Sequence, residues 1–324
     1  MTSRHRYRAA LVALTLQVVV CVAVRADDVL DVEYAEHEPL ATQSLLLDVA
    51  VHGSRLVAVG ERGHVVLSDD DGRTWRQAET VPTRSTLTTV FSIGGRLFAG
   101  GHDAVIITSG DHGMNWSRQF FDPERQQAVM DMYFRDEMHG MAVGSYGLYL
   151  LTSDGGRSWE DSAVDEENEY HLNGIVRFDE QRMMIAGEAG YSYRTFDGGE
   201  SWEMMDLPYQ GSMWGGIRTN DECTLFFGLR GHAMESCDFG DTWNELDTGT
   251  QLSLSGAAMS NGLLVIAGNS GVVLTRADGR FTTHIHSSGV DFAGALALPD
   301  DRFLLVGEDG AHEFPEGTGG DSVD

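Results

Sequence analysis

Apolar and polar positions along this chain follow one motif that returns through most of its length. In residues 57–75, VAVGERGHVVLSDDDGRTW, an apolar strand leads through a Gly-x-x-Gly turn into a second strand and a tight acidic turn that ends at Trp75. The same order returns at residues 141–159, 184–202 and 225–243, and looser copies begin at Leu97, Leu264 and Leu304. The pattern therefore predicts a series of similar antiparallel units.

One glycine marks the same place in every copy, and we call these residues the column glycines. They are Gly60, Gly101, Gly144, Gly187, Gly228, Gly268 and Gly307. Successive members are 39 to 43 residues apart. A period of this length, built from short strands, is typical of propeller blades, which must stack on their neighbours to bury their faces. We predict an all-β fold, a seven-bladed β-propeller with four-stranded blades.

Alternation and turn residues place four strands in the first copy, at residues 45–51, 55–59, 64–68 and 75–79. The first strands of the other copies are predicted at residues 88–92, 129–134, 172–178, 214–218, 254–259 and 292–298. The last copy ends after a third strand at residues 311–314. Residues 29–34 form an unassigned strand, so we expect them to pair with the last copy and close the ring.

Charge narrows the range of partners. The 324 residues contain 50 acidic residues against 22 basic ones, all arginine, and the formal net charge is −28. Such a surface repels phosphate backbones and anionic lipid headgroups. We therefore expect no nucleic-acid binding and no direct binding to anionic membranes.

The first 26 residues predict export. Arg4, Arg6 and Arg8 precede an apolar run, and Ala26 precedes an acidic segment, as in a secretory signal peptide. A retained membrane anchor and a lipoprotein modified at Cys21 are the alternatives. The expected organisation is a signal peptide (1–26), a propeller (27–315) and a flexible acidic tail (316–324). The expected location is the periplasm or the extracellular medium.

Five copies share an acidic turn with the pattern Ser/Thr-x-Asp-x-Gly-x-Ser/Thr/Asn-Trp. Its aspartate and tryptophan pairs are Asp70 and Trp75, Asp111 and Trp116, Asp154 and Trp159, Asp197 and Trp202, and Asp238 and Trp243. An Asp side chain can accept hydrogen bonds from the amides of its own turn, and glycine supplies a backbone angle that other residues resist. We therefore expect a structural role for these residues.

This pattern resembles the Asp-box, or bacterial neuraminidase repeat, and the chain from about residue 29 to 315 looks most like the photosystem II stability/assembly factor family. The resemblance implies an exported, non-enzymatic assembly or scaffold factor, monomeric, that binds a protein partner in a membrane-associated complex. The alternative within the same repeat class is a sialidase-like glycosidase or a lectin. The chain departs from the phototroph members in its acidic charge, because they bind through a basic patch.

Candidate chemistry is sparse. Sialidases use an arginine triad, and the spacing of Arg84, Arg125 and Arg177 singles out no such set. Residues 69–72 suggest a calcium loop, His284 and His286 a metal pair, and Met130, Met132, Met138 and Met141 a copper site. The acidic turn, an outer strand and core packing explain these residues without metal. We predict no catalytic residue, no metal and no cofactor.

Two further predictions concern a disulfide and the face on which a partner would bind. Cys223 and Cys237 flank the turn at residues 228–231, so we predict a cross-strand disulfide in an oxidising compartment, provided that the turn has three residues. A partner is expected on the face formed by the Gly-x-x-Gly turns and the connectors between blades. Arg84, Tyr209 and Trp214 are the candidate contacts there, although Trp214 could equally plug the channel.

Overall fold

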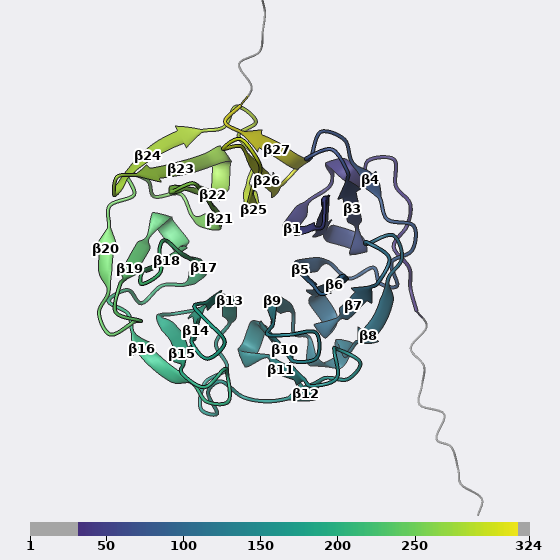
Figure 1. Ribbon diagram of the computed structural model, residues 1–324, viewed down its shortest axis with the longest axis horizontal. Coiled ribbons are helices and arrows are strands. Elements are labelled where there is room, and N and C mark those ends of the chain that lie inside the picture. The colour runs from purple at the N-terminus through teal and green to yellow at the C-terminus, as the bar shows by residue number, and fades with distance from the viewer. Residues whose placement is uncertain (1–31, 317–324) are drawn as a thin grey trace, which may run out of the picture. The chain divides into compact units, whose positions relative to one another are not determined.

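Seven antiparallel sheets follow one another around a ring in the unit that begins at Glu33 (Figure 1). The structure is a computed structural model that describes residues 32–316. The predicted seven-bladed propeller is confirmed. The signal peptide and nearly all of the acidic tail fall outside the described residues, so both stay predictions.

The first strand of each blade lies nearest the centre of the ring (Figure 1). Blade 1 comprises β1 (Leu46–His52), β2 (Arg55–Gly60), β3 (Val65–Ser68) and β4 (Arg76–Gln77). Blade 2 comprises β5 (Leu87–Ile93), β6 (Arg96–Gly101), β7 (Ile106–Ser109) and β8 (Ser117–Phe120). Blade 3 comprises β9 (Val129–Phe134), β10 (Gly140–Gly144), β11 (Tyr149–Thr152) and β12 (Glu160–Asp161). Blade 4 comprises β13 (Leu172–Arg177), β14 (Met183–Gly187), β15 (Tyr191–Thr195) and β16 (Glu203–Asp206).

Blades 5 to 7 repeat this order. Blade 5 comprises β17 (Met213–Arg218), β18 (Thr224–Gly228), β19 (Ala233–Ser236) and β20 (Asn244–Leu246). Blade 6 comprises β21 (Leu254–Ser260), β22 (Leu263–Gly268), β23 (Val272–Ala277) and β24 (Arg280–Ile285). Blade 7 comprises β25 (Phe292–Ala297), β26 (Phe303–Gly307) and β27 (Gly310–Phe314). The predicted innermost strands agree with these bounds to within one residue at either end.

Short 3-10 turns complete the described elements. Two lie in connecting segments, η1 (Ala41–Gln43) and η4 (Pro123–Arg125). The others join the second and third strands of five blades: η2 (Glu61–Gly63), η3 (His102–Ala104), η5 (Ser145–Gly147), η6 (Leu229–Gly231) and η7 (Asn269–Gly271).

The column glycines are required by space. In blade 1 the amide of Glu61 donates to the carbonyl of Leu45, just before the innermost strand, at 3.0 Å. A Cβ added to Gly60 would lie 1.9 Å from that same oxygen. The backbone of Gly60 is extended, with φ −171°, so its backbone angle does not demand glycine. The repeat therefore keeps glycine where two chain segments touch.

The ring closes through side-chain packing between blades 7 and 1. Leu298, Leu304 and Val306 share a buried cluster with residues of blade 1, among them Leu46 and Val49. The last sheet has three strands among the described residues, so it lacks the expected fourth strand. The prediction that residues 29–34 supply that strand is wrong for residues 32–34, which form none; residues 29–31 lie outside the described part.

The segment before blade 1 instead bonds to blade 1 itself. The amide of Ala35 donates to the carbonyl of Val81 at 3.0 Å, and the Gln77 side chain donates to the carbonyl of Glu36 at 2.8 Å. These bonds hold the segment against blade 1. Since blades 7 and 1 already share a core, ring closure does not depend on a strand pair there.

The acidic turns are held by their aspartates. Asp70 accepts from the amide of Thr74 at 2.8 Å, from the Thr74 hydroxyl at 2.6 Å and from the Ser68 hydroxyl at 2.9 Å. Equivalent bonds surround Asp111, Asp154, Asp197 and Asp238. The hydroxyl and amide of Ser158 lower the pKa of Asp154 to about 2. These carboxylates are therefore occupied within their own turns.

The predicted disulfide is confirmed. Cys223 and Cys237 are bonded across β18 and β19. The turn η6 has three residues and pairs Thr224 with Ser236, which places the cysteines opposite each other one position further out. Closing a loop of this size contributes about 3 kcal/mol in the chain-entropy account of disulfides.

We predict that Trp116→Ala is the more harmful of two equivalent truncations. Trp116 is 5% exposed in the core between blades 1 and 2, and its removal should cost about 3 to 5 kcal/mol of unfolding free energy. Trp75, which is only partly buried, should cost less. Urea unfolding followed by circular dichroism measures both. Equal losses for the two variants would contradict this account.

Candidate binding face

The ring presents two faces made of different loops. The mouth face carries the turns between second and third strands and the connectors that lead from one blade to the next. The hairpin face carries the hairpins between first and second strands together with the acidic turns. Of the candidate contacts predicted from the sequence, Arg84 and Tyr209 lie in connectors of the mouth face, and Trp214 lies near the start of the innermost strand β17.

A cavity of about 360 Å³ opens at the centre of the mouth face. Six of its residues hold the same position in successive innermost strands: Leu47, Thr88, Met130, Asn173, Trp214 and Ser255. A β-bulge follows the first residue of each innermost strand and sets this position off. His171, Glu188 and Ser212 complete the lining, and we call this cavity the channel mouth.

Polar residues at this position tie neighbouring blades together. Asn173 donates to the carbonyl of Met213 in the next blade at 2.8 Å. The hydroxyls of Thr88 and Ser255 donate in the same way to the carbonyls of Val129 and Phe292. These side chains are engaged in the ring, so they are poor candidates for ligand contacts.

Two carboxylates make the next set of ties, one residue further along the innermost strands. Asp48 accepts from the amide of Val90 in blade 2 at 2.8 Å, and Asp131 accepts from the amide of Ile175 in blade 4 at 2.7 Å. Burial raises the pKa of Asp48 to about 6, and backbone hydrogen bonds only partly oppose it. Burial, with the nearby charge of Asp48, raises the pKa of Asp131 to about 7. Nothing in the alternating pattern of the sequence signalled these inter-blade ties.

The candidate contacts do not meet in one site. Trp214 is 37% exposed and lines the channel mouth. Arg84 pairs with Glu36 at 2.9 Å and lines a separate cavity of about 180 Å³. Tyr209 stacks on His232 with ring centroids 3.8 Å apart. Whether any of the three binds a partner stays a prediction.

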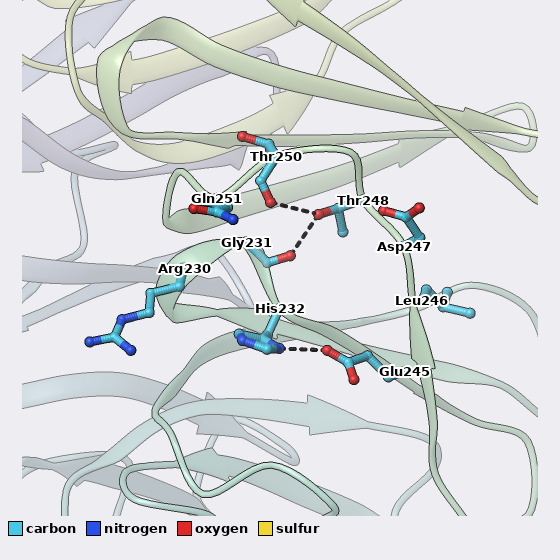
Figure 2. A pocket seen from close by; sticks show the side chains of 9 residues that line it. All are labelled: Arg230, Gly231, His232, Glu245, Leu246, Asp247, Thr248, Thr250 and Gln251. Carbon is cyan, nitrogen blue, oxygen red and sulfur yellow. Dashed lines mark hydrogen bonds and ion pairs between the residues drawn. The ribbon is translucent and has the colours of Figure 1, made fainter.

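His232 in turn lines a polar pocket of about 790 Å³ in blade 5 (Figure 2). Its Nδ1 lies 2.6 Å from Oε1 of Glu245, and the Thr248 hydroxyl donates to the carbonyl of Gly231 at 2.7 Å. These bonds hold the connector after β20 against the turn η6. In Figure 2, Arg230 extends away from the other lining residues. Because the pocket combines a turn with a connector, no sequence motif marks it.

The arginines considered for a sialidase triad do not converge. Arg84 pairs with Glu36, Arg125 with Asp122 and Asp161, and the Arg177 side chain donates to the carbonyl of Asp179. No arginine is among the described residues that line the channel mouth. The arrangement therefore offers no carboxylate-binding cluster of the sialidase kind at that place.

Among residues 32–316, no group of three or more His, Cys, Asp or Glu side chains is arranged so that it could hold a metal ion. Asp69 pairs with Arg55 at 2.6 Å and with Arg76 at 3.2 Å. Met132 and Met141 are buried in the core, while Met138 is exposed.

No helix among residues 32–316 has the length and apolar character needed to cross a bilayer.

The fold and its repeated turns define a seven-bladed propeller. Comparison with known proteins finds one family whose sequence model matches part of the chain. The sequence model of the family described as Photosynthesis system II assembly factor YCF48 matches residues 119–212. The resemblance predicted from the sequence is thus confirmed. A search among curated proteins finds no match.

Solved structures share the fold at low sequence identity. The structure titled YCF48 bound to D1 peptide has a TM-score of 0.70 and 18% identity, covering 86% of this chain and 94% of that one. YCF48 from Cyanidioschyzon merolae has a TM-score of 0.68 and 17% identity, covering 86% and 96%. The WD40 beta propeller domain of Doa1 has a TM-score of 0.66 and 14% identity, covering 87% and 96%. At these identities the likeness shows the fold alone.

We predict that Asp131→Asn flattens the dependence of stability on pH. The pKa of Asp131 is higher in the folded chain than in the unfolded chain, so folding favours its protonated form. Its contribution is fully present below about pH 4 and is lost as the pH rises through about 7. Unfolding free energies measured across this window should therefore fall less steeply in the variant.

The control for this prediction is Asp221→Asn, which removes the same charge from a fully exposed side chain. It should keep the wild-type slope. An Asp131→Asn slope equal to that of the control would show that the carboxylate at the ring centre does not govern this pH dependence.

Proposed function

We propose that this protein is an exported, non-enzymatic propeller that binds a protein partner through its mouth face and acts as an assembly or scaffold factor for a membrane-associated complex. The observation that carries the proposal is the channel mouth, where Trp214 is exposed while Thr88, Asn173 and Ser255 in the same lining tie neighbouring blades together. A large exposed aromatic side chain at the centre of a rigid surface is typical of a protein contact.

The family match supports a partner of this class. YCF48 is described as an assembly factor, and one similar structure is titled as YCF48 bound to a peptide. The Doa1 domain shares the ring as well, which is why the fold by itself does not select a function. The family model and the geometry of the mouth face together support a protein partner.

Charge and the disulfide refine the proposal. With a formal net charge of −28, the chain should favour a partner segment that is basic. The disulfide between Cys223 and Cys237 fits an oxidising compartment, in agreement with a cleaved signal peptide and a periplasmic or secreted protein. We propose that the protein acts as a monomer, which leaves both faces free for partners.

The test is affinity purification of the tagged, processed protein from its native envelope, with mass spectrometry of the proteins that co-purify. We expect a membrane-protein partner that is lost with the double variant Arg84→Ala, Trp214→Ala. The matched control is Ile285→Ala, because Ile285 is 60% exposed on an outer strand and should keep the partner.

Two outcomes would contradict the proposal. A partner retained by the double variant would exclude the proposed face. Failure to recover a partner, together with turnover of a panel of glycosides by the purified protein, would favour the glycosidase alternative.

A further inference from the structure

The interface between blades 3 and 4 stays open on the hairpin face. A cavity of about 300 Å³ lies there, and Met141, Leu151 and Met183 form its apolar floor. The same side chains belong to the core between these two blades. The cavity is thus an unfilled end of that core, and we call it the interblade pocket.

Two of the other interfaces fill this place with a side chain from the chain itself. The deciding position is the residue between Asp and Gly in each acidic turn. In blade 5 it is Phe239, which packs edge-to-face on Phe178 of blade 4 with centroids 4.9 Å apart. In blade 2 it is His112, whose Nδ1 lies 3.1 Å from Nε2 of His52 in blade 1. In blades 3 and 4 the position is glycine, Gly155 and Gly198, so neither turn has a side chain to offer.

Between blades 1 and 2, and between blades 2 and 3, an arginine of the earlier blade caps the main chain at this position. Arg55 donates to the carbonyl of His112 at 2.9 Å, and Arg96 donates to the carbonyl of Gly155 at 2.8 Å. Both arginines stand five residues before a column glycine. His139 holds that position in blade 3, and its Nδ1 lies 2.9 Å from Oδ2 of Asp136 instead.

A buried hydroxyl at the pocket also lacks a partner. Tyr133 is 7% exposed, lines the interblade pocket, and has no hydrogen-bond partner for its hydroxyl within the described residues. A buried polar atom without a partner is uncommon in folded proteins, because its desolvation is not compensated. An occupant with a polar edge would complete this site.

Acidic side chains at the rim of the interblade pocket favour a positively charged occupant. Glu160, Glu180 and Glu200 line the pocket, are exposed and form no ion pair among residues 32–316. The guanidinium of Arg135 also lines the pocket and reaches 3.7 Å from where a Cβ on Gly198 would stand. A ring placed there would face this cation on one side and the methionine side chains on the other.

We propose that the interblade pocket binds an aromatic side chain of a protein partner whose neighbouring residues are basic. The ring takes the place that Phe239 fills from within the chain at the next interface, and the three glutamates attract the flanking charges. A tyrosine is the best match, because its hydroxyl can pair with that of Tyr133. This contact lies on the hairpin face and does not depend on the mouth-face function.

The test uses three capped peptides, acetyl-Arg-Tyr-Arg-amide, acetyl-Arg-Ala-Arg-amide and acetyl-Glu-Tyr-Glu-amide, titrated into the processed, oxidised protein and followed by NMR. Only the first should bind measurably. Gly198→Phe plugs the pocket and should weaken that binding by about tenfold or more, because it supplies the ring from within. Gly279→Phe controls for the backbone angle, since φ is +78° at Gly279 and +79° at Gly198, although a Cβ meets nothing within 4 Å at Gly279 and lies 3.1 Å from the Glu180 carbonyl oxygen at Gly198.

A second variant keeps the test independent of folding. If Gly198→Phe lowers the melting temperature so far that it cannot be titrated, Arg135→Gln with Glu180→Gln should produce the loss instead, since both side chains are exposed. Three results would overturn the proposal: unchanged binding in the variants that fold, equal binding of the alanine peptide, or loss of binding in Trp214→Ala, which would place the peptide at the channel mouth.

Discussion

Crowding of the innermost strands at the centre of the ring is the constraint on which this structure depends. A Cβ added to Gly256 would lie 2.6 Å from the Cα of Gly294 in the next blade, and one added to Gly174 would lie 3.4 Å from the Cα of Gly215. Blades 4 to 7 carry glycine where β1 and β9 carry the aspartates, and at Gly256 the neighbouring backbone leaves no room for a side chain. The polar ties join these neighbouring strands, whereas each column glycine lies against the segment that leads into the innermost strand of its own blade.

This constraint separates residues that hold the ring from residues that are free to act. Thr88, Asn173 and Ser255 line the channel mouth, yet each donates to the neighbouring blade. Trp214 lies in the same series and stays exposed. The hairpin face follows the same logic, because Phe239 completes one interface while Gly198 leaves the preceding one open. The best candidates for function are therefore residues such as Trp214 and Gly198, which do not perform the structural role of the equivalent residues in other blades.

The repeat made the fold predictable. Its period and its turn residues predicted seven blades, the innermost strands and the disulfide, because each depends on neighbours close in sequence. The way the ring closes was harder to predict, because Leu304 and Val306 pack on blade 1 residues that are far away in the sequence. The separation of Arg84 from Trp214 follows from the size of the ring. The interblade pocket was hidden because the meaning of Gly198 depends on Tyr133 and Met183, which are distant in sequence.

The central claim is that a protein partner binds the mouth face of a rigid ring. Hydrogen exchange of the processed protein, alone and with its purified native complex, tests this claim most directly, because it reports protection along the whole backbone. The account predicts that the complex protects segments around residues 129–131, 171–174 and 212–216, while the outermost strands exchange as before. Protection confined to the outermost strands, with unchanged exchange at these segments, would contradict it.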